Sequence, residues 1–447
     1  MVSSKERVSS QNFCTKHDLE AFEDQRLAPY AIKSFYATRQ RNIRSEGRIH
    51  DYRTEFQRDR DRILHSRAFR RLKHKTQVFV ATEGDHQRTR LTHTLEVSQM
   101  ARTLCRALSL NEDLAEAIAL GHDLGHTPFG HIGEEVLHGI MSGQDDLDGL
   151  LDFMTLGNPG GFKHNCQSLR VVDLLEKRYE EDGLNLTDET RIGILRHTSL
   201  PDDMTYQAFE SKKFSVKGPL FLEAQVVSIA DEVAQQAHDM EDGLRAGLVD
   251  LEKIERLRIM KEMIRKIHPD YHATRSRFLK QNMLVRGTIH VLLTDILVNS
   301  AKKIKEWGSR EGIISSEQFY QRLNDFPSDL IEFSRKGKGL FQELKEFVYR
   351  EIINSYEVNI MDGRAIHFIR NLYKAYYNNP RQLQDWVLLR YAHGRREAYL
   401  RDIPLKEVGR KIHKLQDDPV FLRLISDHIA GMTDKFAMDE YRKLYLP

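Results

Sequence analysis

The densest group of chemically competent side chains lies in the segment LGHDLGHTPFGHIGE, residues 120–134. The chain has 20 histidines in 447 residues, and this segment combines several of them with two carboxylates: His122, Asp123, His126, His131 and Glu134. Imidazole and carboxylate groups together bind Mn²⁺, Fe²⁺, Zn²⁺, Ni²⁺ and, less readily, Mg²⁺. Because they also transfer protons near neutral pH, the segment indicates a metal site, a proton-transfer site, or both.

The adjacent pair His122–Asp123 cannot form a metal site by itself. Neighbouring helical residues point about 100° apart, so other elements must complete the ligand shell. His93 and Asp231 each lie on a helix face made otherwise of core residues, where a polar group is costly without a partner. We therefore predict a metal site formed by His93, His122, Asp123 and Asp231. The alternative for each residue alone is a hydrogen-bonded core histidine, or an aspartate that caps a helix or forms an ion pair.

The elements that position these residues are predicted to be helices. Glycine (26 residues) and proline (11) are scarce, and apolar residues recur at helical spacing. Helices are expected at about 91–108, 112–124, 131–140 and 220–240, with a Gly/Asp-rich loop at 141–162 and amphipathic helices beyond about 330. The predicted fold class is all-α.

The chain is expected to fall into three parts. Residues 1–48 are expected to form a polar arm with a basic end, ATRQRNIRSEGR. That end could contact a neighbouring subunit, phosphate or single-stranded nucleic acid, or it could simply be solvated. Residues 49–330 are predicted to form the catalytic core, and residues 331–447 a C-terminal helical region packed on it.

Composition narrows the function classes. Lys and Arg (68) barely exceed Asp and Glu (66), which argues against a protein that mainly coats nucleic acid. The three cysteines, Cys14, Cys105 and Cys166, show no C-x-x-C spacing, as expected in a reducing compartment. No secretory signal or membrane-length apolar run is apparent. We expect a cytoplasmic location without membrane contact.

Several segments resemble one known family: RTRLTHTLEV, ALGHDLGHTPFGHIGE, GGFKHNCQSLRVVDLLE, and LEAQVVSIADEVA followed by HDMEDGLRAG. They are similar to the HD-domain deoxynucleoside triphosphate triphosphohydrolases, the dGTPase-like proteins of bacteria. The likeness runs from about residue 67 to about residue 300 and resumes in DHIAGMTDKFAMDEYRKLY. It implies an all-α HD-domain helical bundle with additional C-terminal helices. The family's metal ligands fall on the four residues predicted above.

The resemblance also implies a reaction. A dNTP would be hydrolysed to deoxynucleoside and inorganic triphosphate by attack of water at the α-phosphorus, with Mn²⁺ or Mg²⁺ as the expected ion. It implies that His131 and Glu134 form a catalytic pair in which Glu134 orients the imidazole three residues before it. His126 and His164 match further active-site histidines. The alternative for Glu134 is a first-turn glutamate that complements the helix dipole, and for the two histidines it is support of the metal ligands.

Substrate contacts are implied in the same way. Arg90 matches an arginine on the α-phosphate, where its guanidinium can bind bidentately. Gln77 and Asp239 match residues that contact the sugar, although Asp239 alone could be a surface residue near a helix end. Gln235 stands where the family usually has a tyrosine, so the aromatic face is lost. The preferred base is left open.

The family further implies a symmetric homo-oligomer, often a hexamer, and a dNTP activator, while single-stranded DNA is another candidate partner. One alternative function is that of another HD phosphohydrolase, acting on nucleoside monophosphates, cyclic nucleotides or guanosine polyphosphates. Another is a nucleotide-sensing or single-strand-binding module without turnover. The residues that favour the triphosphohydrolase are His131, Glu134, Arg90, Gln77 and Asp239.

Overall fold

The computed structural model describes residues 13–41, 52–77, 88–157, 159–200, 209, 211, 213–323, 326–327 and 329–446. Its regular elements are helices, and the described residues form only isolated bridges, Arg39 with Thr187 and Thr76 with Thr89, in place of a sheet. The all-α prediction is confirmed. None of the described helices combines the length and apolar composition needed to cross a bilayer.

The first half of the described chain contains α1 (Lys16–Arg26), α2 (Glu55–Leu64), α3 (Arg67–Arg71), α4 (Arg90–Ala107), α5 (Glu112–Gly121), α6 (Gly130–Ser142), α7 (Phe153–Leu156), α8 (His164–Arg170), α9 (Asp188–Arg196) and α10 (Leu222–Arg245). The second half contains α11 (Leu251–Glu255), α12 (Arg258–Lys266), α13 (Arg277–Glu311), α14 (Ser316–Gln321), α15 (Arg335–Val348), α16 (Tyr356–Asn378), α17 (Asp385–Arg395), α18 (Leu405–Gln416), α19 (Pro419–Ala430) and α20 (Asp434–Tyr445). The four helices predicted from apolar spacing are present as α4, α5, α6 and α10.

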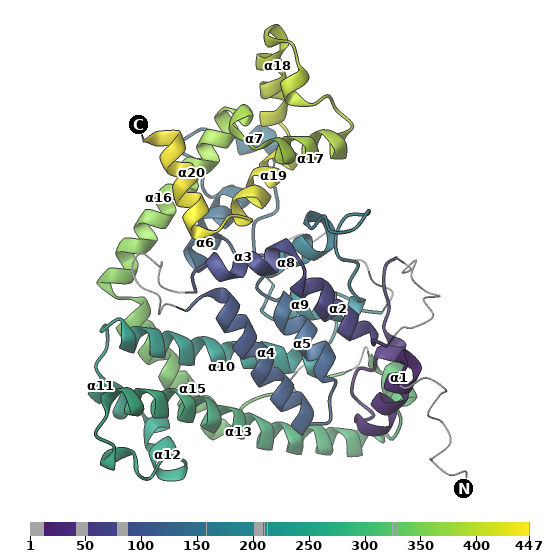
Figure 1. Cartoon of the computed structure of the whole chain (residues 1–447), viewed down its shortest axis with the longest axis vertical. Helices are drawn as coiled ribbons and strands as arrows, with labels where there is room; N and C mark the ends of the chain where they lie inside the picture. The colour runs from purple at the N-terminus through teal and green to yellow at the C-terminus, as the bar shows by residue number, and fades with distance from the viewer. Residues whose placement is uncertain are drawn as a thin grey trace.

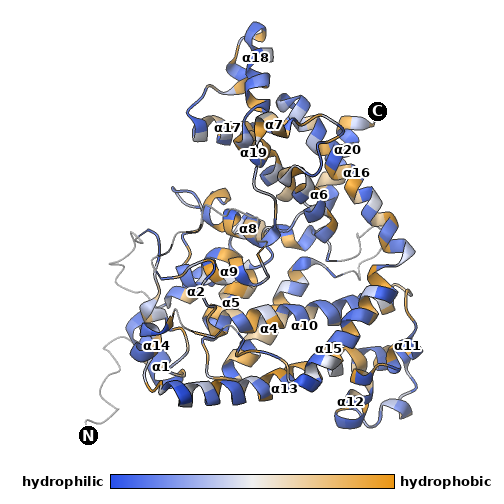
Figure 2. Ribbon diagram, turned by 180° about the vertical axis from the view of Figure 1, so that it is seen from behind, coloured by the Kyte–Doolittle hydropathy of each residue, from blue (hydrophilic) through white to orange (hydrophobic). Residues whose placement is uncertain are grey.

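A first hydrophobic core is enclosed by α2, α4, α5, α9, α10, α13 and α15 (Figure 1). Thr89 and Asn111 are the N-cap residues of α4 and α5, and the side chain of each accepts a backbone N–H in the first turn of its helix. Val97, Met100 and Leu104 form the buried face of α4. Figure 2 shows hydrophobic and hydrophilic residues alternating along α4, α10 and α13, as expected of helices with one buried face.

A second hydrophobic core joins α6 to the C-terminal helices α16, α17, α19 and α20. Its members include Val136 and Leu137 of α6 and Tyr373 of α16. These helices occupy the upper part of the view in Figure 1, and α18 projects beyond them. Residues 120–134 therefore bridge the two cores, because α5 belongs to the first and α6 to the second.

The described part of the predicted polar N-terminal arm packs on the core. Ala31 and Ile32 are completely buried. Arg39, from the basic end of the arm, forms ion pairs of 2.6 Å with Glu55 and with Asp59, so its guanidinium is already engaged. The rest of that basic end, residues 42–48, lies outside the described residues.

The predicted loop at 141–162 is largely correct. Helix α6 extends to Ser142, and the short helix α7 interrupts the loop. Five of its glycines have positive φ: Gly143, Gly149, Gly157, Gly160 and Gly161. This backbone conformation favours glycine and explains the composition of the segment.

Glu223 at the start of α10 predicts a pH dependence of stability. Its fully buried Oε1 accepts N–H bonds from Ile32 (2.9 Å) and Asn111 (3.0 Å). Burial raises the pKa of Glu223 from 4.5 to about 7. The folded state therefore holds a proton that the unfolded chain releases, and stability falls as pH rises from 4.5 to about 7, by up to about 1.4 kcal/mol per pH unit. Glu223→Gln should remove this loss.

Thermal unfolding at about pH 5 and about pH 8 tests this. Relative to wild type, Glu223→Gln should gain stability at the higher pH. The matched control is Glu306→Gln on α13, whose side chain is 65% exposed. An equal difference between Glu223→Gln and wild type at both pH values would contradict the prediction.

Candidate active site

The four predicted metal ligands converge. His93 comes from α4 and Asp231 from α10, while His122 and Asp123 lie in the turn directly after α5. One nitrogen or oxygen atom from each of His93, His122 and Asp123 lies within 4.8 Å of the others. Asp231 Oδ1 is 2.9 Å from His93 Nε2 and 3.6 Å from His122 Nε2. A mixed nitrogen and oxygen set of this kind could hold a divalent ion.

His122 is oriented toward the centre of this group. Its Nδ1 donates to the carbonyl of Ala119 at 2.6 Å, which leaves the Nε2 lone pair free to bind an ion. Nε2 is fully buried and has no hydrogen-bond partner among the described residues. Burial alone would lower the pKa of His122, but the carboxylates of Asp123 and Asp231 outweigh it and raise the pKa to about 9. The same two carboxylates would stabilise a metal cation in that place.

His93 is oriented by a hydrogen-bonded chain. Its Nδ1 lies 3.0 Å from His238 Nδ1, and His238 Nε2 lies 2.7 Å from a carboxylate oxygen of Glu96. Burial lowers the pKa of His238 to about 4, so this ring is neutral and donates to Glu96. His238 must then accept from His93, which leaves His93 Nε2 as an acceptor facing Asp231. Two acceptors 2.9 Å apart require a cation or a proton between them.

Asp123 is held by three basic groups. Arg90 Nη1 donates to Oδ2 at 2.9 Å, and His126 Nε2 lies 3.1 Å from Oδ1. Burial opposes ionisation, but His122, His126 and Arg90 prevail and hold the pKa of Asp123 well below its usual range. Nε and Nη2 of Arg90, which is 1% exposed, have no partner among the described residues. Two buried guanidinium donors are therefore available to an anion.

The turn from α5 to α6 fixes the next residues. A Cβ at Gly125 would lie 2.1 Å from the backbone nitrogen of Ser168, so only glycine allows the turn to approach α8 this closely. Phe129 has the left-handed φ of 63°, and its N–H donates to Asp434 Oδ1 at 2.9 Å. His131 then emerges, exposed, in the first turn of α6. Its ring centroid lies 5.4 Å from that of His126.

Glu134 was expected to pair with His131, but its carboxylate contacts Lys163 and His164 instead. Its carboxylate accepts from Lys163 at 2.7 Å, lies 2.5 Å from His164 Nδ1 and caps the backbone N–H of His164. The expected hydrogen bond to His131 is absent from the described contacts. The rings of His164 and His126 stack at 3.9 Å. Glu134 therefore contacts His164 directly, and only its charge acts on His131.

The predicted substrate residues lie close to this group. Gln77 and Asp239 are buried, and each has a side-chain oxygen without a partner among the described residues. Asp239 is near enough to Arg90 and Asp231 to be affected by their charges, and burial raises its pKa well above the usual range. Gln235 is half-buried on the same helix, one turn before Asp239.

The sequence analysis missed three residues that support the site. His238 follows Asp231 at the i, i+7 spacing of one helix face, a signal that could have identified it. His197, 2% exposed, lies 3.2 Å from His164 through their Nε2 atoms and donates from Nδ1 to Ile194. Lys163 gave no signal beyond its position next to His164.

Comparisons with known proteins agree with this arrangement. The HD-domain family model matches residues 90–235, and the model of a phosphohydrolase-associated domain matches residues 331–404 and 405–443. The fold and the histidine–aspartate set thus define an HD-superfamily phosphohydrolase.

Curated relatives identify the family within that superfamily. A protein of Nitrosomonas europaea is 39% identical over 421 residues, 94% of this chain and 98% of its own length. One from Azoarcus is 40% identical over 94% of this chain and 96% of its own, and one from Geobacter sulfurreducens 36% identical over 96% and 97%. All three are named deoxyguanosinetriphosphate triphosphohydrolase-like protein. The chain belongs to this family.

Replacement of Asp231 by alanine should abolish metal binding, because it removes the carboxylate between His93 and His122. The metal content of the purified variant, measured by mass spectrometry after incubation with Mn²⁺, tests this. Asp239→Ala, a buried aspartate further along the same helix, is the matched control and should retain the metal. Unchanged stoichiometry in Asp231→Ala would rule out Asp231 as a ligand.

Proposed function

We propose that this phosphohydrolase cleaves dNTPs to deoxynucleoside and inorganic triphosphate, using a divalent ion held by His93, His122, Asp123 and Asp231. Mn²⁺ or Mg²⁺ is the first choice, with Fe²⁺, Ni²⁺ and Zn²⁺ as alternatives. One observation carries the proposal: several buried polar atoms around the cluster have no hydrogen-bond partner among the described residues. These atoms belong to Arg90, His122, His126, Gln77 and Asp239. Native proteins rarely leave such atoms unsatisfied, so a polar ligand is expected here.

The phosphate end of the substrate would bind between the metal ligands and Arg90. The free Nε and Nη2 of Arg90 can accept one phosphate group bidentately, because a planar guanidinium matches two phosphate oxygens. Nη2 would lie 3.4 Å from a Cβ at Gly130, so Arg90 reaches the N-terminus of α6, where a helix favours anions. A bound divalent ion would polarise the phosphoryl group and make water a better nucleophile.

Proton transfer is assigned to the histidines at the start of α6. His131 would donate a proton to the departing 5′-oxygen, or remove one from the attacking water on the opposite side. The stacked rings of His126 and His164 would position it. The Glu134 carboxylate, 2.5 Å from Nδ1 of His164, would hold the His164 ring in this position.

The sugar would contact Gln77, Asp239 and Gln235. Burial raises the pKa of Asp239, which favours its protonated form, and in that form it could donate a hydrogen bond to the 3′-hydroxyl as well as accept one. Gln235 offers an amide in place of an aromatic face. The choice of base is left to experiment.

The remaining expectations complete the proposal. They are a symmetric homo-oligomer such as a hexamer, a dNTP activator, contact with single-stranded DNA, and a cytoplasmic location. We also propose boundaries for the three parts of the chain at residues 48 and 330, the second of which lies next to the start of the phosphohydrolase-associated match.

Product analysis is the direct test of the reaction. Purified protein with Mn²⁺ or Mg²⁺ is mixed with each dNTP and its ribose counterpart, singly and in mixtures, and products are resolved by chromatography and phosphorus NMR. We expect deoxynucleoside and inorganic triphosphate. Monophosphate with pyrophosphate would reject attack at the α-phosphorus with loss of the 5′-oxygen, and would favour another HD phosphohydrolase activity.

Replacement of His131 by alanine should separate chemistry from metal binding. We expect turnover to fall by about 10²- to 10⁴-fold, as for loss of a general acid or base, while the metal content stays unchanged. Glu135→Gln, an exposed residue on the same helix, should retain activity and serves as the control. Loss of the metal in His131→Ala would refute the assigned role.

A further inference from the structure

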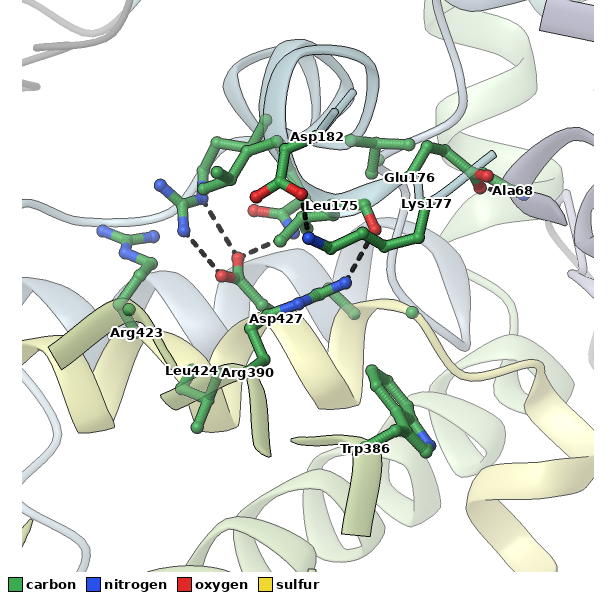
Figure 3. Close-up of a pocket in the computed structure, with 18 of the residues that line it drawn as sticks. Ala68, Leu175, Glu176, Lys177, Asp182, Trp386, Arg390, Arg423, Leu424 and Asp427 are labelled. Carbon is green, nitrogen blue, oxygen red and sulfur yellow. Dashed lines mark hydrogen bonds and ion pairs between the residues drawn. The ribbon is translucent and has the colours of Figure 1, made fainter. Parts of the chain in front are cut away.

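A cavity of about 750 Å³ lies beside the C-terminal helices (Figure 3). Its walls come from α3, α8, the π-helical turn Val171–Leu175, α17 and α19. Leu124 and Gly125, which directly follow the ligand Asp123, form part of one wall. The residues assigned to metal, substrate and proton transfer do not line it. The cavity is thus separate from the candidate active site.

Basic side chains dominate the lining of this cavity. The basic members are Arg67, Arg71, Lys75, Arg170, Lys177, Arg390, Arg395 and Arg423, and the acidic members are Glu176, Asp182 and Asp427. In a chain whose total charge is nearly balanced, this is a local excess of positive charge. Such an excess in a concave site attracts anions.

The three carboxylates are already engaged. Asp427 accepts two hydrogen bonds from Arg170, at 3.1 and 2.6 Å, and one from Gln167 at 3.0 Å. Figure 3 shows this carboxylate projecting from α19 into the middle of the group. Asp182 pairs with Lys177, and Glu176 accepts the N–H groups at the start of α3 at 3.2 and 2.7 Å. Little acidic charge is left for the other arginines.

Three arginines donate only to main-chain carbonyls within the described structure. Arg71 donates to Gly431 at 2.9 Å, and Arg390 to Leu175 at 2.7 Å. Arg423 donates to Pro159 and Gly161 at 3.0 and 2.7 Å. Burial, with the nearby charge of Arg170, lowers the pKa of Arg390 and of Arg423 despite the attraction of Asp427. Each guanidinium has further N–H donors, and an anion would relieve the repulsion between Arg71 and Arg390 and that between Arg423 and Arg170.

An aromatic side chain borders the same cavity. Trp386 is 45% exposed, and the guanidinium carbon of Arg390 lies 5.6 Å from the centroid of its ring. An exposed indole face next to arginines can stack on a planar group. The volume of about 750 Å³ is within the usual range for a small-molecule site.

We propose that this cavity binds the polyphosphate group of a small anion through Arg71, Arg390 and Arg423. The phosphate oxygens accept hydrogen bonds from these arginines, which have no carboxylate acceptor among the described residues. The anion is either inorganic triphosphate or a nucleotide, and a nucleotide would also stack its base on Trp386. The proposal does not depend on the reaction assigned to the HD site.

Trp386 provides a reporter for the test. The chain has two tryptophans, and the other, Trp307, is buried in α13 against Phe326. In a Trp307→Phe background, Trp386 fluorescence is titrated with inorganic triphosphate and with dATP in the presence of a chelator. We expect a saturable change with both. The double replacement Arg71→Gln with Arg390→Gln should weaken binding at least about tenfold, because it removes charge-assisted bonds.

Controls separate this cavity from the active site. Arg364→Gln, an exposed arginine on α16, should leave the affinity unchanged. Arg90→Gln should also retain the Trp386 response, even though it disables the proposed catalytic site, so the two proposals fail independently. Arg71→Gln alone serves if the double variant unfolds, since Arg71 is exposed.

Calorimetry on Trp386→Ala distinguishes the two ligand sources. Weaker dATP binding with unchanged inorganic triphosphate binding identifies a nucleotide site, while equal affinities for both probes before and after the substitution identify a site for the polyphosphate alone. The absence of a saturable response to either probe, or an unchanged affinity after loss of Arg71 and Arg390, would overturn the proposal.

Discussion

The burial of Asp123 is the constraint on which the site depends. An isolated carboxylate in the interior would be strongly destabilising. Here Arg90 and two imidazoles surround it, and each of these groups must in turn be oriented and satisfied. Arg90 is fixed by the start of α4, and His122 by the last turn of α5. The packing of α4 against α5 and α10 therefore does more than fill a core, because it maintains the spacing at which these charges neutralise one another.

The interior is divided into two hydrophobic cores, and the candidate site lies where they meet. The proposed metal ligands lie on, or directly after, helices of the first core, whereas α6, with His131 and Glu134, packs with α16 and α19 in the second. The ion pair between Arg170 of α8 and Asp427 of α19 joins the two cores. At the start of α20, Asp434 accepts N–H bonds from Thr76 and from Phe129, which lies in the turn before α6. The position of His131 relative to the proposed metal ligands thus depends on the C-terminal helices, although most of the sequence motifs that resemble the family lie well before those helices in the chain.

The helices around the site and its four clustered residues could be predicted from the sequence. The contacts that could not be predicted are those made between segments distant in the chain. Helical period and the cost of burying polar groups identified the four helices and led to the four residues that converge. The partner of Glu134 was not predictable, because its i, i+3 neighbour competes with Lys163 and His164, which reach it only through the folded loop. His238 on α10 contacts His93 on α4, and the residue spacing along one helix does not predict where two helices cross. The N-terminal segment looked like a polar arm because its contacts, such as those of Ile32 and Arg39, are made with residues distant in the chain.

The close contact at Gly125 has a consequence for how this protein can vary. Gly125 donates to Ser168 Oγ at 2.8 Å, and the same hydroxyl donates to the carbonyl of His122 at 2.6 Å. The small side chain of Ser168 thus holds the peptide groups on both sides of Asp123. The rest of α8 places His164 in the candidate active site and Arg170 in the arginine-lined cavity beside α17 and α19. A larger residue at 125 or 168 would displace all of these at once. Positions 125 and 168 should therefore change together or not at all during divergence. Because α8 contributes to both sites, a mutation that shifts α8 at the arginine-lined cavity would also alter the candidate active site.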